Sequence, residues 1–237
     1  MRKSRSRPAR TAAAQARKRS RVDLETKLKP QQNRARSTYD AILEAAGELL
    51  AEVGVERLST NLVCKRAGLT PPALYRYFPN KYALLKELGE RLMADQDEAV
   101  FAWQEKFRGR EPKSIEDEAD TRCKIEREVN AITRRFPGGG WVMRALRAVP
   151  TLSQVRIKSR EMVAERDFEN LVKRFPDADR KVLRIAATLQ VEVMYAATEL
   201  VLDQPELDSD IITEEISYMT ALYIQSFAHR RKRALAK

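Results

Sequence analysis

The chain has 237 residues and a formal net charge of +11, from 45 Lys and Arg against 34 Asp and Glu. This length suits one or two domains, and a hydrophobic content of 43% suffices for a helical core. Two cysteines are too few for a disulfide framework, so we expect Cys64 and Cys123 to be reduced thiols. With a single histidine and no nucleophile–base pair, the sequence predicts neither a metal site, nor a cofactor, nor an enzyme.

The whole charge imbalance lies at the N-terminus. Residues 1–37 contain 13 Lys and Arg and two acids, whereas the remaining 200 residues carry 32 charges of each sign. We predict a basic arm over 1–33 that is disordered when free and adds salt-dependent affinity for nucleic acid. A solvated tail and a transit peptide are the alternatives. The start lacks an apolar signal region and no 18-residue apolar run exists, so no secretion or membrane span is expected.

A helix-turn-helix pattern over 58–81 is the most informative feature of the chain. Ser59 and Thr60 open a run of apolar residues at helical spacing, and Gly68 ends it. Thr70 then starts a second helix, because the proline that follows it needs no N–H partner at the first helical position. In a helix-turn-helix the second helix lies in the DNA major groove, so this pattern predicts DNA as a partner.

The second helix, roughly 70–77, is too short to be stable alone, since isolated helices below about 12–15 residues are marginal in water. Leu74 and Phe78 lie four residues apart and predict the apolar face that packs it against the domain. Pro79 ends the helix, and Asn80 is placed to cap the next one. An ordinary helical corner without DNA binding is the alternative interpretation.

Beyond residue 82 the pattern predicts helices throughout, because Gly and Pro gather at a few joints and no stretch has the period of a strand. Thr151 and Gln154 match a capping box. The three glycines before Trp141 predict a flexible joint where a pocket mouth could lie. The expected fold class is therefore all-α. Helices are expected at about 81–108, 114–135, 140–148, 152–174, 177–203 and 208–233.

From about Tyr39 to Leu88 the chain resembles the DNA-binding domain of TetR-type (tetracycline-repressor-like) transcriptional regulators. The resemblance rests on ILEAAGELLAEVG, which begins at Ile42, on the Ser-Thr opening of the second helix, on AGLT, and on ALYRYFPNK, which ends at Lys81. It implies an N-terminal three-helix domain over 34–82 that binds DNA. It also implies a helical domain over 83–237 that binds an effector and dimerises.

The resemblance implies individual DNA contacts as well. Thr60, Thr70, Tyr77 and Lys81 would contact phosphates, and Tyr75 would touch a base or the backbone. Phosphate contacts of this kind fix the register of the protein on DNA without reading the sequence. The predicted DNA-contacting residues are Arg34, Arg36, Ser59, Thr60, Thr70, Pro71, Pro72, Ala73, Tyr75, Arg76, Tyr77 and Lys81.

Pro71 and Pro72 depart from the family pattern, in which a polar or small pair more often approaches the base edges. Neither proline has an N–H or a polar side chain, so this tip offers thymine methyl groups only apolar contact. We therefore expect sequence reading by Tyr75, by Arg76 and through DNA shape. Arg34 and the neighbouring arginine at position 36 are expected in an adjacent minor groove.

The last two long helices carry apolar stripes that look like half of a four-helix interface. In the resemblance, the last two helices of each subunit form a homodimer, and a two-fold dimer matches a palindromic operator. The alternative is that both stripes belong to the intramolecular core. The predicted interface residues are Ile185, Leu189, Val193, Ala196, Ile212, Ile216, Met219, Tyr223 and Phe227.

Large apolar and amphipathic side chains between the DNA-binding domain and these stripes predict a binding site for a small effector. Ligand pockets are mostly apolar with a few polar groups, so composition does not distinguish a pocket wall from the core. A place in the core is therefore the alternative for each residue. The predicted effector-binding residues are Trp103, Phe107, Trp141, Met143, Met162, Phe168, Met194 and Tyr195.

The sequence thus predicts a bacterial, cytoplasmic and nucleoid-associated DNA-binding regulator. We expect a repressor that a small, largely apolar effector releases from its operator. One alternative is a DNA-binding protein of the same fold without a small-molecule effector, controlled by a protein partner or acting architecturally. The other is an enzyme with an incidental helix-turn-helix, for which the sequence offers no catalytic cluster.

Overall fold

The computed structural model describes residues 22–28 and 33–235, with side chains described as far as residue 228. This part of the chain is all-α, as the sequence predicts, and each long helix beyond residue 80 starts and ends within about three residues of its predicted bounds. Cys64 and Cys123 are free and buried. The elements are α2 (Asn33–Arg57), α3 (Thr60–Ala67), α4 (Pro71–Tyr75), α5 (Lys81–Lys106), α6 (Ile115–Arg135), α7 (Gly139–Ala148), the 3-10 turn η1 (Pro150–Leu152), α8 (Ser153–Arg174), α9 (Arg180–Asp203) and α10 (Ser209–Leu235).

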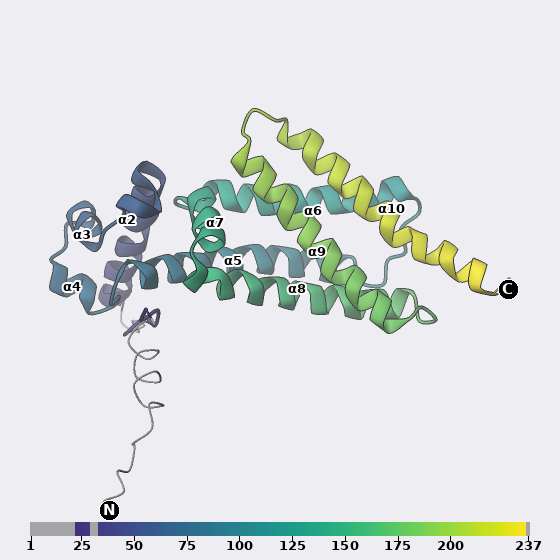
Figure 1. Cartoon of the computed structure of the whole chain (residues 1–237), viewed down its shortest axis with the longest axis horizontal. Coiled ribbons are helices and arrows are strands. Elements are labelled where there is room, and N and C mark those ends of the chain that lie inside the picture. The colour runs from purple at the N-terminus through teal and green to yellow at the C-terminus, as the bar shows by residue number, and fades with distance from the viewer. Residues whose placement is uncertain (1–21, 29–32, 236–237) are drawn as a thin grey trace, which may run out of the picture.

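The helices form two regions joined by α5 (Figure 1). Helices α2, α3 and α4 gather at one end of the molecule, and α5 runs from there into a bundle with α6, α8, α9 and α10. One buried core extends from α2 through α5 to α7, and it includes Ile42, Leu84 and Leu146. A second core lies between the last part of α8, the first part of α9 and the second half of α10, around Phe168 and Ile224. The α5 helix therefore connects the two regions as one continuous helix.

Glycines let α2 approach the turn between α6 and α7. A Cβ at Gly47 would lie 2.4 Å from the carbonyl oxygen of Pro137, and one at Gly138 would lie 2.2 Å from the carbonyl oxygen of Gly47. Gly138 also has a φ of 66°, which other residues rarely adopt. The prediction of a flexible pocket mouth here is wrong, because this joint is a tight backbone contact between the two regions.

The start of α8 also differs from its prediction. Thr151 lies inside η1, where no side-chain capping bond forms, and Ser153 Oγ instead donates to the carbonyl oxygen of Pro150 at 2.8 Å. The Thr151–Gln154 capping box is therefore absent, because the 3-10 turn moves the helix start past the predicted cap.

Within the described residues, α9 is long and apolar enough, by length and composition alone, to cross a membrane. Arg184, Glu192 and Glu199 interrupt the apolar residues of this helix, so it contains no unbroken 18-residue apolar run, and the absence of a membrane span stays a prediction. In the structure α9 packs against α8 and α10, while Ile185 and Leu189 on its other side are exposed. The helix is thus apolar on two faces, one in the bundle and one at the surface.

Candidate DNA-binding surface and ligand cavity

Helix α3 is fixed at both ends and by one ion-pair cluster. Ser59 Oγ accepts a hydrogen bond from the backbone N–H three residues on at 3.3 Å, and Gly68 ends the helix in the left-handed conformation, with φ of 65°. Arg66 donates to both carboxylate oxygens of Glu52, at 2.9 and 2.7 Å, and to Glu48 at 3.2 Å. These bonds lower the pKa of Glu52 and tie α3 to α2. Arg66 therefore stabilises the packing of α3 against α2.

Helix α4 is held by Leu74 and Phe78, which are fully buried as predicted. Thr70 occupies the N-cap position, but its side chain makes no capping bond. A capping side chain accepts from the N–H of the second or third helical residue, and Pro72 at the second position has none. The N–H of Ala73 at the third position donates instead to the carbonyl oxygen of Thr70 at 3.0 Å. The two prolines thus leave the Thr70 hydroxyl at the surface.

The exposed side of the helix-turn-helix brings several predicted contacts together. The hydroxyls of Thr60 in α3 and Tyr75 in α4 lie 3.0 Å apart and form a hydrogen bond. Tyr75 is 39% exposed, Pro71 and Pro72 are exposed on the same short helix, and Arg76 is exposed directly after it. This hydrogen bond sets the position of two polar groups at a surface that also carries the two prolines and the Arg76 side chain.

Two predicted phosphate contacts are engaged inside the domain. Tyr77 is only 4% exposed, and its ring packs edge-to-face on Tyr39 with centroids 5.6 Å apart. Tyr77 follows Leu74 by three positions and shares its buried side, and the phosphate contact expected of its hydroxyl stays a prediction. Lys81 Nζ donates to the carbonyl oxygens of Val55 and Glu56 at 3.0 and 3.3 Å, which joins α5 to the segment after α2.

Residues 22–28 lie against the helix-turn-helix, where the sequence predicts a disordered arm. The backbone N–H of Lys27 donates to the carbonyl oxygen of Tyr77 at 2.8 Å, and Asn80 Nδ2 donates to the carbonyl oxygen of Asp23 at 2.7 Å. Lys27 Nζ reaches the carbonyl oxygen of Tyr75 at 3.3 Å, which places a cation at the end of α4. The prediction is therefore wrong for 22–28, while residues 1–21 lie outside the described part of the chain.

Arg34 and Arg36 lie in the first turn of α2 and are exposed. Asn80 caps α5 as predicted, since its side chain accepts from the N–H groups of Tyr82 and Ala83 at 2.9 and 3.1 Å. The start of α5 is thereby fixed directly beside the last turn of the helix-turn-helix.

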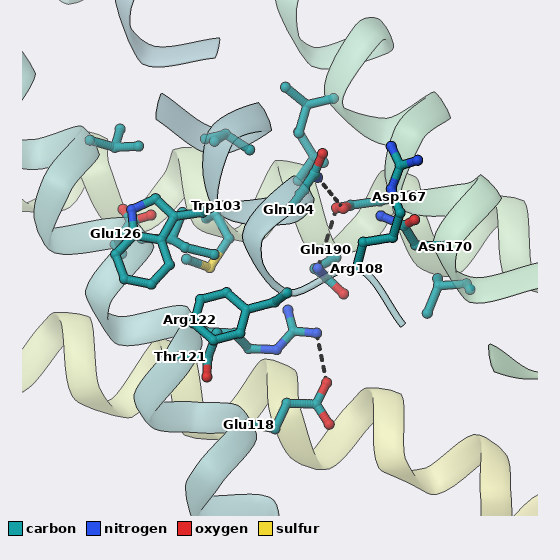
Figure 2. A pocket seen from close by; sticks show the side chains of 18 of the residues that line it. Trp103, Gln104, Arg108, Glu118, Thr121, Arg122, Glu126, Asp167, Asn170 and Gln190 are labelled. Atoms are coloured by element: carbon teal, nitrogen blue, oxygen red, sulfur yellow. Dashed lines mark hydrogen bonds and ion pairs between the residues drawn. The ribbon is translucent and has the colours of Figure 1, made fainter. Parts of the chain in front are cut away.

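A cavity of about 470 Å³ lies in the helical bundle between α5, α6, α8 and α9 (Figure 2). The loop 107–112 between α5 and α6 lines one side of it. Five predicted residues line the cavity: Trp103, Phe107, Met143, Met194 and Tyr195. Its volume lies in the range typical of small-molecule pockets, about 300–1,000 Å³.

Three other predicted residues do not line this cavity. Trp141 and Met162 are exposed at the surface, and Phe168 is buried in the second core with Arg184 stacked over its ring. The sequence predicts that these large apolar residues lie in helices. It does not say which neighbouring helix, or solvent, each side chain faces. Plain core or surface is their role.

The cavity wall is more polar than the sequence suggests. Asp167 Oδ1 accepts from Gln104 Nε2 at 2.7 Å, and its Oδ2 accepts from Gln190 Nε2 at 3.3 Å. Burial raises the pKa of Asp167 to about 6, against an ordinary value of 3.8. Figure 2 shows both amides directed at this carboxyl group.

Two further buried acids line the same space. Glu126 is 4% exposed and accepts from the Thr198 hydroxyl at 2.7 Å, and burial raises its pKa to about 7. Asp97 accepts from the Ser159 hydroxyl at 2.7 Å, and burial raises its pKa as well. Sequence reasoning missed these groups, since Asp and Glu on a helix are normally solvent-exposed.

A fourth acid, Glu118, is fully paired. It accepts from Arg174 with both oxygens at 2.9 Å and from Arg122 at 2.9 Å. Burial acts to raise its pKa, but the two guanidinium groups outweigh burial and lower it. Among the described residues, no group of three or more His, Cys, Asp or Glu side chains is arranged to hold a metal ion.

Comparison with known proteins identifies the family. The model of "Bacterial regulatory proteins, tetR family" matches residues 42–88. The tetracycline repressor protein class A from transposon 1721 of Escherichia coli is 41% identical over 70 residues, which are 30% of this chain and 28% of the repressor. The chain belongs to the TetR family.

Two more relatives extend this picture. The nucleoid occlusion factor SlmA of Aliivibrio fischeri is 33% identical over 103 residues, 42% of this chain and 47% of SlmA. The structure of SmeT, the repressor of the Stenotrophomonas maltophilia multidrug efflux pump SmeDEF, superposes with a TM-score of 0.60 over 80% of this chain and 91% of SmeT, at 20% identity. SmeT is also known in complex with triclosan. The chain spans about a quarter to a half of the length of the curated relatives it matches.

Members of the TetR family are transcriptional regulators and not enzymes. In this member the stripes predicted for a dimer interface are partly exposed. Ile185 and Met219 are 59% and 54% exposed, and Leu189 is exposed beside them. Val193, Ile212, Ile216 and Tyr223 are half-buried, and Ala196 is exposed.

Phe227 is the exception in that predicted interface. Its ring is buried in the second core beside Phe175 and Tyr223, so it belongs to the packing within one subunit. Apolar residues on both sides of α10 make its stripe ambiguous from sequence. The exposed side of α10 instead carries Ile211, Tyr218 and Leu222.

Proposed function

We propose that this TetR-family protein is a homodimeric repressor that binds a palindromic operator through α3 and α4. The observation that carries the proposal is the exposed surface of the helix-turn-helix, where Thr60 and Tyr75 are joined and Arg76 stands beside them. Hydroxyl groups of this kind position a protein on phosphates, and an arginine at a groove reads guanine. The protein would act on chromosomal DNA in the bacterial cytoplasm.

The exposed apolar side chains of α9 and α10 support the dimer. Ile185, Leu189, Met219 and Leu222 are large and exposed in the single chain, and a contiguous apolar patch on a helical surface marks an interaction site. A two-fold interface formed by these two helices would yield a four-helix arrangement, with one DNA-binding region on each subunit.

The position of α5 supports control by an effector. The helix begins at Lys81, directly after its cap Asn80 beside the helix-turn-helix, and Trp103 and Gln104 near its other end line the cavity. At 1.5 Å per residue, its 26 residues span about 39 Å. A ligand that shifts the cavity end of α5 would move the two DNA-binding regions of the dimer out of operator register, a coupling commonly of about 1–3 kcal/mol. Because the cavity wall contains Asp167 and Glu126, the effector is amphipathic, with a polar end, where the sequence suggests a largely apolar one.

The second candidate is a DNA-binding protein of this fold without a small-molecule effector. The match to the nucleoid occlusion factor SlmA over 103 residues favours it. In that case occupancy of the cavity would leave operator affinity unchanged, and a protein partner would control the DNA-bound state.

Selection of binding sites from random duplexes tests the DNA-binding part of the proposal. We expect enrichment of a palindrome with half-sites about one helical turn apart. Arg76→Ala should lower operator affinity by roughly 1–3 kcal/mol and relax preference at one position, because base contacts carry about that energy. Lys158→Ala, an exposed cation on α8, is the matched control and should change nothing. An Arg76→Ala protein with unchanged affinity and preference would contradict the assignment.

A further inference from the structure

The acidic side chains of the cavity differ in the partners they have. Asp97, Glu126 and Asp167 accept hydrogen bonds only from neutral groups, namely a serine, a threonine and two glutamine side chains. No ion pair to any of the three forms among the described residues. Buried carboxylates in proteins are normally paired with a cation. Here no ion pair with any described residue offsets burial, which raises the pKa of all three groups.

The arginines that line the cavity are paired with other acids, and the one lining lysine, Lys173, is exposed. Arg122 and Arg174 both bind Glu118, and Arg110 pairs with Asp117 at the end near the loop 107–112. Arg108 pairs with Glu105 at the exposed rim. These ion pairs therefore lie at one end of the cavity. The carboxyl groups of Asp97, Glu126 and Asp167 have no ion pair within the described part of the chain, although the charge of Arg122 acts to lower the pKa of Asp167 against the effect of burial.

Hydrogen-bond acceptors without a partner lie in the same wall. Gln104 and Gln190 turn their NH₂ groups to Asp167, which leaves the Oε1 atom of each amide buried without a donor. One donor, Nε of Arg122, is also without a partner. A buried acceptor left unpaired costs about 1–3 kcal/mol, which a ligand N–H would recover.

The rest of the wall suits an apolar body. The rings of Trp103 and Phe107 stack with centroids 5.3 Å apart, and Val100, Val129 and Met194 line the cavity near them. Aromatic and aliphatic walls with a few placed polar groups are typical of sites for drug-sized molecules. The cavity volume of about 470 Å³ accommodates a ligand with one ring or a short alkyl chain.

We propose that the cavity binds an organic cation, with an ammonium or similar N–H-bearing head group at Asp167 and Glu126 and an aryl or alkyl body against Trp103 and Met194. The head group supplies the missing charge and donates to the amide oxygens of the wall. Binding of a cation does not depend on the proposed function. Its role as the effector that releases DNA rests on that function.

Calorimetric titration of the full chain with three ligands of the same body tests the ligand class. The probes are 4-phenylbutylamine, 4-phenylbutanol and 4-phenylbutanoate, which share a phenyl ring on a four-carbon chain and end in a cationic, a neutral and an anionic head group. We expect the amine to bind at least tenfold more tightly than the alcohol and the carboxylate to bind most weakly. Equal affinities, tighter binding of the carboxylate, or no binding of the amine would overturn the proposal.

Two substitutions localise the head group. Asp167→Asn and Glu126→Gln should each lower the affinity for the amine at least tenfold and leave the affinity for the alcohol within threefold. Glu161→Gln, an exposed acid on α8, is the matched control and should leave all three affinities unchanged. Circular dichroism melts identify a variant that fails to fold, and the other variant then decides. Equal losses for amine and alcohol in a folded variant would contradict a charge contact.

Operator release is measured separately, by fluorescence anisotropy of labelled operator DNA. Amine binding without any change in operator affinity would refute the effector role and leave the ligand class standing. Release by the alcohol or the carboxylate, with no effect of the amine, would refute the ligand class and support effector control.

Discussion

Replacing Glu126 by glutamine should remove a pH-dependent loss of stability. Burial raises the pKa of Glu126 to about 7, against an ordinary value of 4.5. The folded protein therefore holds this proton in a range where the unfolded chain has released it. Because the folded state then binds more protons than the unfolded state, the free energy of unfolding falls as pH rises from about 4.5 through about 7.

The size of the effect follows from the two pKa values. One unit of pKa difference corresponds to about 1.4 kcal/mol, so the shift of Glu126 corresponds to roughly 3 kcal/mol of stability lost across that range. Asp167 adds a loss of the same sign, with a pKa of about 6 against 3.8, and it remains in the variant. Glu126→Gln has nearly the same shape and keeps an oxygen for the Thr198 hydroxyl, so only the titration is removed.

Urea denaturation of both proteins at pH 5, 6, 7 and 8 measures the difference. The experiment uses one protein concentration, because dimer formation makes stability depend on concentration. We expect the variant to gain stability relative to the parent as pH rises, by up to roughly 3 kcal/mol near pH 8. Parallel profiles for the two proteins would show that Glu126 is ionised in the folded state, and the reasoning about its environment would be wrong.

Three further predictions concern the joint, the interface and the arm. Gly47→Ala should destabilise the protein by about 1–3 kcal/mol, because its Cβ would lie 2.4 Å from the Pro137 carbonyl oxygen; an unchanged melting temperature would contradict this packing. Ile185→Glu should shift the protein from dimer to monomer in analytical ultracentrifugation with its helix content retained, whereas an unchanged dimer would exclude this part of α9 from the interface. Deleting 1–21 while keeping 22–28 should flatten the salt dependence of DNA binding and preserve sequence preference. An unchanged slope would remove the arm as a DNA element.

The helix-turn-helix could be predicted from sequence because its signals are local. Gly68 ends α3 and Asn80 caps α5 where the sequence places them, and Leu74 packs inward as the spacing requires. The direction of Tyr77 could not be predicted, since an amphipathic aromatic residue suits a surface or a core, and only the packing on Tyr39 decides.

The cavity was predictable only in its apolar half. Trp103 and Met194 are recognisable because large apolar residues on helices face inward. Asp167 and Glu126 are charged residues on amphipathic helices, and such residues normally face solvent. Their burial depends on the way four helices meet, which no local pattern records. The same limit applies to residues 22–28, whose hydrogen bonds link the chain to positions about 50 residues away.

Fluorescence anisotropy with the selected operator and a scrambled duplex of equal length and composition tests the central claim most directly. At one physiological salt concentration, we predict that the full chain binds the operator at least about 10³-fold more tightly than the scrambled DNA, as specific regulators do. Equal affinity for the two duplexes would contradict the claim, because the basic arm alone would then account for the binding.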